Sequence, residues 1–269
     1  MVRGGNALFH LLGALHSGFS QDYACGVAYA DNRFFLDLTD NRIFEALEES
    51  AKWSGERQIL NAMLKPGDTF VDLGANHGSY SLVAAHLVGP TGFVAAFEPQ
   101  PRLSRLVEES LRRTGACPYK VFAAGCSDRS RSAEFFIPSH ASGSAGVFRG
   151  FSGSSRHKKI NIALTTLDES LVDIPIRQSL FLKIDVEGSE YDALIGAGKT
   201  IERHRPAILF EVNPRSATAA GHGVRELFEL LCEMGYSSVC EIDEFPQRRP
   251  IRVADDARQR NLLALHESA

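Results

Sequence analysis

The feature that most constrains this chain lies between positions 69 and 88, where an apolar strand pattern leads through a glycine turn into a helical pattern. The run ends at Asp72, and the turn reads Asp-x-Gly-x-Asn-x-Gly, with Gly74, Asn76 and Gly78 at its fixed places. In a parallel α/β sheet this order points a helix N-terminus at a nucleoside-containing ligand. Glu98 ends the next apolar run, where a carboxylate can accept hydrogen bonds from ribose hydroxyls.

The turn also indicates the cofactor. A dinucleotide fingerprint has a second glycine where this chain has Asn76, because the backbone there must approach a pyrophosphate. S-adenosylmethionine has no pyrophosphate, so the turn favours a methyl donor over a nicotinamide. Two alternatives stay open. One is an NAD-dependent oxidoreductase, although no hydride-transfer constellation is recognisable, and the other is a non-catalytic protein that keeps the cofactor pocket.

Composition limits the kind of protein. With 269 residues, 44% of them hydrophobic, the chain suits one large α/β domain with a modest extension. Its net charge of −4 argues against a general nucleic-acid binder, so we expect no nucleic-acid partner. Five cysteines without a C-x-x-C pair are typical of reduced intracellular thiols and predict a cytoplasmic protein. No apolar run could span a bilayer, so we expect no membrane partner, whereas a homo-oligomer is allowed.

The order of the elements predicts a doubly wound, mostly parallel sheet of seven strands with helices on both faces. The seven expected strands are 70–73, 93–97, 120–124, 181–184, 207–210, 238–242 and 261–266. The expected helices are 56–64, 79–88, 102–113, 189–203 and 224–234. Residues 1–54 are interpreted as an accessory segment, with a helix at 7–15 and a hairpin over 26–38, and residues 55–269 as the main domain.

An insertion interrupts this alternation at about 132–164. It begins with a strand pattern at 133–137 and continues into a stretch rich in glycine, serine and basic residues at 140–159. A loop of this length in a compact enzyme is typically a lid or a binding loop, or else a solvated flexible segment. Its place after the third strand predicts a cover over the acceptor.

Several motifs together resemble the FkbM family of S-adenosylmethionine-dependent methyltransferases. They follow one another in the family's order: Asp72-Leu73-Gly74-Ala75-Asn76-His77-Gly78, Ala96-Phe97-Glu98-Pro99, Ser127-Asp128, Thr165-Thr166-Leu167-Asp168 and Lys183-Ile184-Asp185-Val186-Glu187-Gly188-Ser189-Glu190. The resemblance covers roughly residues 55–212, and 261–264 fit a last family strand. It implies the Rossmann-like class I methyltransferase fold.

The resemblance also implies roles for single residues. Gly74, Asn76 and Gly78 would shape the turn under the methionine part of the cofactor, and Asp72 would order that turn. Glu98 would bind the ribose diol. Ser127 and Asp128 would end the third strand, with Asp128 at the adenine amino group. Family members typically methylate hydroxyl oxygens of sugars and secondary metabolites, so the expected partner is a small hydroxylated acceptor.

Acidic residues at the ends of the fourth and fifth strands are the candidates for catalysis. A hydroxyl is a poor nucleophile, so a base or a metal ion must help to remove its proton. Asp185 is our first choice as base, with Glu187 beside it and Lys183 two residues back as a charge partner. His77 in the cofactor turn is a rival base.

Two other interpretations of these acids remain. Asp185, Glu187 and Glu211 together could hold a divalent cation, which we do not favour because Lys183 is adjacent. Alternatively, the carboxylates bind the methionine ammonium and stabilise the N-terminus of the following helix.

Overall fold

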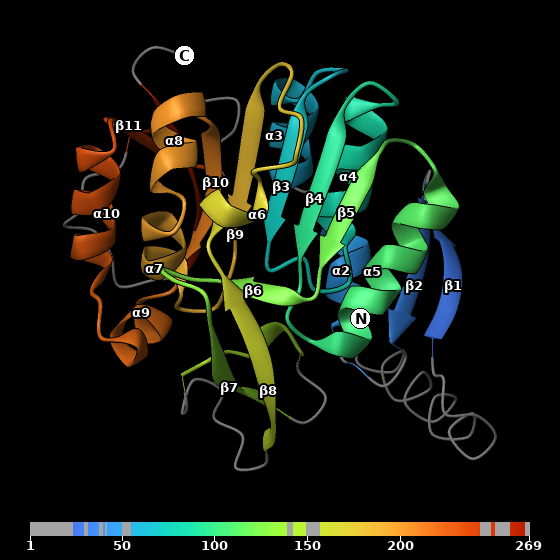
Figure 1. Ribbon diagram of the computed structural model, residues 1–269, viewed down its shortest axis with the longest axis horizontal. Helices are drawn as coiled ribbons and strands as arrows, with labels where there is room; N and C mark the ends of the chain where they lie inside the picture. Colours follow the sequence, from blue (N-terminus) through green and yellow to red (C-terminus); the bar gives the residue numbers. More distant parts are fainter. Residues whose placement is uncertain are drawn as a thin grey trace.

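The computed structural model describes residues 24–29, 32–37, 40, 42–49, 55–138, 142–148, 157–242, 249–250 and 259–266 (Figure 1). The helix expected at 7–15 lies outside these residues, as does much of the stretch at 140–159. Among the described residues, no helix is both long and apolar enough to cross a membrane.

A mixed sheet of eight strands forms the centre of the molecule, in the order β12-β11-β13-β10-β9-β3-β4-β5. Five neighbouring strands run parallel, and the remaining pairs are antiparallel. The parallel strands are β3 (Thr69–Leu73), β4 (Phe93–Phe97), β5 (Tyr119–Phe122), β9 (Leu180–Ile184) and β10 (Ala207–Val212). The others are β11 (Ser238–Glu241), β12 (Arg249–Pro250) and β13 (Arg260–Leu265). The doubly wound order is confirmed, but the expected seven strands become eight, because the short β12 pairs with β11.

Helices cover both faces of this sheet because successive side chains of a strand point to opposite sides. Phe70 belongs to one core cluster and its neighbour Val71 to the other, and both side chains are fully buried. One face packs against α2 (Ile43–Glu49), α3 (Gly55–Met63), α4 (Ser79–Val88) and α5 (Pro101–Thr114). The other packs against α6 (Leu167–Ser170), α7 (Glu190–Ile195), α8 (Gly198–His204) and α10 (Val224–Glu233). The short α9 (Pro214–Ala220) follows β10.

A second sheet of three strands lies below the carboxyl ends of β3, β4 and β5 in Figure 1. It consists of β6 (Ala124–Cys126), β7 (Arg131–Pro138) and β8 (His157–Thr165), in the order β6-β8-β7. A short 3₁₀ helix, η1 (Ser142–Ser144), follows β7, and Gly146 forms a bridge with Phe136. The two ends of the expected insertion, 132–138 and 157–164, thus belong to a sheet that lies at the end of the main one.

The structure corrects two expected elements. The third strand, expected over 120–124, ends at Phe122, and the chain then leaves the large sheet and begins β6. The helix expected over 189–203 is two helices, α7 and α8, with Gly196 and Ala197 between them, and a side chain at Gly196 would collide with the carbonyl of Ser127.

The expected hairpin in the accessory segment is confirmed. Strands β1 (Ala24–Tyr29) and β2 (Asn32–Asp37) pair antiparallel, and β2 packs against α5. Helix α2 was not expected from the sequence, and it contacts α4. The accessory segment therefore brings side chains to the main domain near the ends of its strands.

Candidate active site

The glycine turn after β3 leaves no room for a side chain at its first glycine. Gly74 has φ of 84°, and a Cβ there would collide with the carbonyl oxygen of Asp185. Asn76 also has a left-handed backbone, with φ of 51°, which asparagine tolerates better than most residues. Its side-chain oxygen accepts from its neighbour His77, and its amide donates to Ser142 in η1 at 3.1 Å. The turn is therefore held on one side by β9 and on the other by the insertion.

Glu98 is buried at the end of β4 and holds this turn. Its two carboxylate oxygens accept from the backbone N–H of Asn76 at 2.8 Å and of Gln100 at 2.9 Å. Burial raises the pKa of Glu98 to about 7, although these backbone donors act in the opposite direction. A carboxylate oxygen has a second lone pair, so both can still accept from a ligand.

A first cavity opens between this turn and the small sheet. One side is polar, with Asn76, Glu98 and Gln100, and the other is apolar, with Phe135, Ile162 and Leu164. Glu187 also lines it, and its buried Oε2 has no hydrogen-bond partner among the described residues.

This cavity fits S-adenosylmethionine, which is cationic at one end and carries an apolar adenine at the other. On the polar side Glu98 would accept from a ribose diol, and Glu187, whose Oε2 has no hydrogen-bond partner among the described residues, would receive an ammonium. The apolar side of β7 and β8 would accept a flat ring. The arrangement therefore matches the cofactor that the turn predicted.

A buried ion-pair network lies where β9 ends. The ammonium of Lys183 lies 3.3 Å from Asp185 and 3.6 Å from Asp72, and 4.6 Å from the centre of the Tyr80 ring. Burial lowers the pKa of Lys183, but Asp185 and Asp72 outweigh this and raise it overall. The ammonium is therefore charged at neutral pH. Asp72 itself is fully buried and accepts from Ser81, so it fixes the start of the turn without lining the first cavity.

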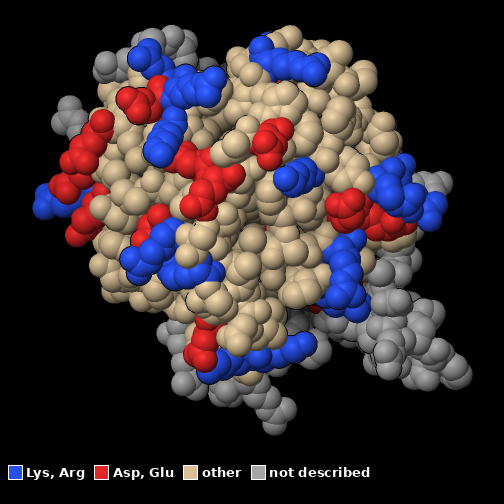
Figure 2. All heavy atoms as spheres, in the orientation of Figure 1, with Lys and Arg blue, Asp and Glu red and all other residues tan. Residues whose placement is uncertain are grey.

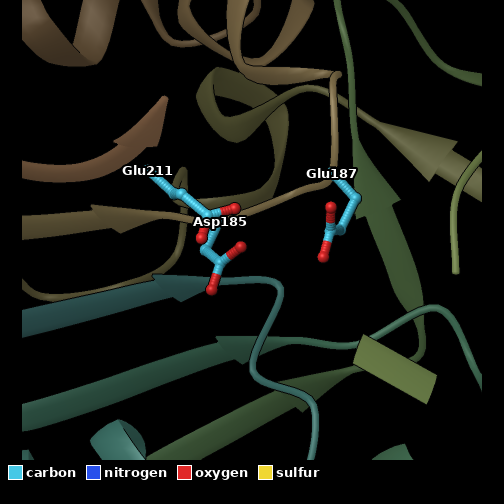
Figure 3. Close-up of side chains that lie close together, drawn as sticks. All are labelled: Asp185, Glu187 and Glu211. Atoms are coloured by element: carbon cyan, nitrogen blue, oxygen red, sulfur yellow. The ribbon is translucent and has the colours of Figure 1, made fainter. Parts of the chain in front are cut away.

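Three carboxylates come together at the ends of β9 and β10 (Figure 3). Asp185, Glu187 and Glu211 each have an oxygen within 4.8 Å of the others. Burial and the charge of Asp185 raise the pKa of Glu187 to about 10 and that of Glu211 to about 8. Glu187 also has a left-handed backbone, with φ of 52°, which is uncommon for this residue type. The cluster would be stabilised by a cation or by protons.

A second cavity, of about 480 Å³, adjoins the first. Its walls are mostly polar and come from α2, α3, α4 and the ends of β9 and β10. Among the described residues, Arg42 and Asp185 line both cavities. Glu187 lines the first cavity and Glu211 the second, so the three acids lie across their junction. Asp185, with about a fifth of its side chain exposed, lies at this junction.

Five residues expected in the site do not line either cavity: Asp72, His77, Gly78, Ser127 and Asp128. Asp128 is paired with Arg131 at 2.8 Å and accepts from Ser127. Its neighbour Cys126 lines the first cavity instead. His77 is buried rather than exposed; its Nδ1 lies 2.7 Å from Asn76, and burial lowers its pKa. The adenine contact of Asp128 stays a prediction, and so does His77 as a base.

Several site residues were not expected from the sequence. Arg42 lies directly before α2 and pairs with Glu49 of that helix at 2.7 Å, and Glu49 also accepts from Ser79 next to the turn. Ser142 comes from the glycine- and serine-rich insertion. The insertion's composition was the available signal for Ser142. No local pattern marked Arg42.

The family model for the methyltransferase FkbM domain matches residues 72–238. A structure of methyltransferase FkbM from Methylobacillus flagellatus is similar at 17% identity and a TM-score of 0.45, covering 84% of this chain. The match spans 55% of that protein's length.

Two further structures are similar in fold. An S-adenosylmethionine-dependent O-methyltransferase from Thermotoga maritima shares 14% identity, with a TM-score of 0.43 and coverage of 84% of this chain and 70% of that one. Fibrillarin from Aeropyrum pernix, crystallised with S-adenosylmethionine, shares 13% identity, with a TM-score of 0.43 and coverage of 78% and 73%. The comparison with curated proteins gave no significant match. The family match carries the assignment: the chain belongs to the FkbM methyltransferases, and its cofactor is S-adenosylmethionine.

Proposed function

We propose that this protein transfers the methyl group of S-adenosylmethionine to a hydroxyl oxygen of a small molecule, a sugar or a glycosylated or polyketide metabolite. The observation that carries this proposal is Asp185, which lines the first cavity and remains accessible from the second. A carboxylate at the edge of the cofactor cavity can accept a proton from an approaching hydroxyl. Lys183 beside it is charged and cannot serve as the base.

The residues present support an in-line displacement. When bound, S-adenosylmethionine supplies a methyl group on a positively charged sulfur. Asp185 takes the hydroxyl proton as the acceptor oxygen forms its bond to the methyl carbon, and the carbon–sulfur bond breaks to give S-adenosylhomocysteine. Lys183 holds the Asp185 carboxylate in place at 3.3 Å. Alignment of the reacting atoms supplies much of the rate enhancement in such a reaction.

In this proposal the remaining residues hold the cofactor. Gly74, Asn76 and Gly78 shape the turn under its methionine part, and Glu98 accepts from the ribose hydroxyls. Glu187 receives the ammonium, since its Oε2 is buried without a partner among the described residues. Residues 55–269 form the catalytic domain, and the insertion acts as its lid. The described parts of that insertion, 132–138, 142–148 and 157–164, contribute Phe135, Ser142 and Ile162, among others, to the first cavity.

The test is release of S-adenosylhomocysteine by hydroxylated acceptors, followed by mass spectrometry of the product. Asp185→Asn keeps the size of the side chain and should lower turnover by about 10²–10⁴-fold, with cofactor affinity nearly intact. Glu229→Gln, on the exposed surface of α10, is the matched control and should leave both constants unchanged. Loss of cofactor affinity with normal turnover at saturation would show that Asp185 only anchors the cofactor.

A second candidate mechanism uses a divalent cation held by Asp185, Glu187 and Glu211. The closeness of their oxygens favours it, because hard cations prefer such ligands. The ammonium of Lys183 at 3.3 Å argues against it, since it already compensates part of the negative charge. A chelator followed by magnesium or manganese distinguishes the two. Activity that survives the chelator supports the base, and activity lost and then restored by the ion supports the metal.

A small-molecule acceptor fits the surface better than a nucleic acid. On the face shown in Figure 2, basic and acidic side chains of the described residues are interspersed rather than gathered into a basic stripe. A nucleic-acid methyltransferase needs a basic footprint, and its binding falls steeply with salt. Oligonucleotide binding with such a salt dependence would contradict this part of the proposal.

A further inference from the structure

We infer that Tyr80, in the first turn of α4, binds the methyl acceptor, and that its hydroxyl donates a hydrogen bond to an oxygen of that molecule in the second cavity. This inference rests on the proposed function, since it concerns the acceptor of that reaction. Tyr80 follows shortly after Gly78 of the cofactor turn, and of the two cavities it lines the second. Asp185 lines both, so a molecule in the second cavity can reach the proposed base and Tyr80 together.

The hydroxyl of Tyr80 has no hydrogen-bond partner in the described part of the chain. This is unusual, because the residue is only 6% exposed and buried tyrosine hydroxyls usually have a partner. The next residue, Ser81, shows the usual pattern, since its buried hydroxyl donates to Asp72 at 2.6 Å. A buried donor that lines a cavity without a partner marks a place where a ligand can accept a hydrogen bond.

The ring of Tyr80 is held in place independently of its hydroxyl. The ammonium of Lys183 lies 4.6 Å from the ring centre, within the range of a cation–π interaction. Tyr80 also belongs to the core cluster on the side of the sheet that α4 covers. The hydroxyl therefore has a defined position before any ligand arrives, and little side-chain entropy is lost when one binds.

The hydroxyl of Tyr80 can serve as a donor but not as a base. Burial and the carboxylates around the cavity raise the pKa of Tyr80 well above its ordinary value, so the hydroxyl keeps its proton at neutral pH. Two other donors of the second cavity are engaged, because Lys183 pairs with Asp185 at 3.3 Å and Asn261 donates to Glu56 at 2.7 Å. Ionised carboxylates only accept. Tyr80 thus offers a donor to a lone pair of the acceptor, while Asp185 takes the proton of the reacting hydroxyl.

Tyr80→Phe tests this role, since it removes the hydroxyl and keeps the ring. The acceptors are methyl glucoside, glucosamine and catechol, assayed by release of S-adenosylhomocysteine. For a compound that is methylated, kcat/KM should fall by about 3–10-fold, which corresponds to the loss of one neutral hydrogen bond. The Kd for S-adenosylhomocysteine should stay unchanged. The urea midpoint should stay unchanged or rise, because the hydroxyl has no partner to lose among the described residues of the ligand-free protein.

Tyr236→Phe is the matched control. Its hydroxyl is also buried, but it donates to the carbonyl of Pro206 at 2.7 Å, and the residue lines neither cavity. This variant should lower the urea midpoint and leave kcat/KM and the Kd for S-adenosylhomocysteine unchanged. Tyr80→Leu removes the ring as well and should lower the urea midpoint, because Lys183 then loses its aromatic contact. The two variants at position 80 therefore separate the role of the ring from that of the hydroxyl.

A kcat/KM that Tyr80→Phe leaves unchanged overturns the inference while O-methylation stands. A urea midpoint that falls as far as in Tyr236→Phe, or an equal loss of affinity for S-adenosylhomocysteine, also overturns it, since the hydroxyl then acts in the fold or on the cofactor. If none of the three compounds is methylated, their binding to the protein loaded with S-adenosylhomocysteine is measured by calorimetry. Binding that Tyr80→Phe weakens supports the inference and contradicts the proposed function. Binding that this variant leaves unchanged, or binding of none of the compounds, overturns both.

Discussion

Replacing Glu98 by alanine tests whether one carboxylate both builds the turn and binds the ribose. In the ligand-free protein Glu98→Ala leaves the N–H groups of Asn76 and Gln100 without their acceptors at 2.8 and 2.9 Å. A hydrogen bond to a charged group contributes about 1.5–3 kcal/mol, so the free energy of unfolding should fall by about 3–6 kcal/mol. Water entering the cavity would reduce this value, which is therefore an upper estimate.

The same substitution should also weaken cofactor binding, because two ribose hydroxyls lose a charged acceptor. Each of these two hydrogen bonds contributes about 1.5–3 kcal/mol, so the binding free energy of the cofactor should fall by about 3–6 kcal/mol. This loss corresponds to a rise in Kd of about 10²–10⁴-fold. Urea denaturation measures the first effect, and calorimetric titration with S-adenosylhomocysteine measures the second.

Glu190 provides the matched control for this experiment. It is equally buried, accepts from the backbone N–H groups of Gly188 and Val186, and does not line the first cavity. Glu190→Ala should therefore lower stability by a similar amount and leave cofactor affinity unchanged in the folded protein. If both variants weaken S-adenosylhomocysteine equally, Glu98 has no ribose contact and the reasoning fails.

Three more outcomes follow from the structure. Gly74→Ala should lower the free energy of unfolding by more than about 3 kcal/mol in urea denaturation, because the added Cβ would collide with the backbone carbonyl of Asp185. Gly89→Ala is the control: no atom lies within 4 Å of its Cβ, so it should lower the free energy of unfolding by only about 1 kcal/mol. Affinity for S-adenosylhomocysteine should rise between about pH 6 and pH 8. Burial raises the pKa of Glu98 to about 7, and ribose hydroxyls donate to the ionised form of this carboxylate, which becomes more populated over that range. An equally steep rise in the Glu98→Gln variant would contradict this prediction. Lys183→Met should lower the free energy of unfolding by about 3–5 kcal/mol, since two carboxylates lose their cationic partner. Adding Asp72→Asn should restore part of this loss in denaturation experiments. No recovery would argue against the ion pair between Lys183 and Asp72.

Much of the main sheet could be predicted because its signals are local. Strand β3, which ends at Leu73, and the turn through Gly74 and Asn76 lie where the pattern put them, as do the parallel strands β9 and β10. Short apolar runs between turns are sufficient to indicate buried parallel strands. The grouping of Asp185 with Glu211 followed from the same rule, since both end neighbouring strands.

The rest depends on contacts between distant segments. β5 ends at Phe122 because the next residues pair with β8, about forty positions later, and no local pattern shows that pairing. Arg42 reaches the site only because α2 packs on α4. His77 carries a polar side chain in a loop, yet it is buried beside Asn76, which only the tertiary fold determines.

The origin of the two cavity walls has a consequence for how this enzyme could change over evolution. The strand ends and the glycine turn supply most of the polar residues that would hold the cofactor, and these lie within the family match. Arg42, Glu49 and Glu56 of the second cavity lie before that match begins. The segment ahead of β3 could therefore diverge and reshape the second cavity while the glycine turn and the strand ends of the first cavity are inherited unchanged.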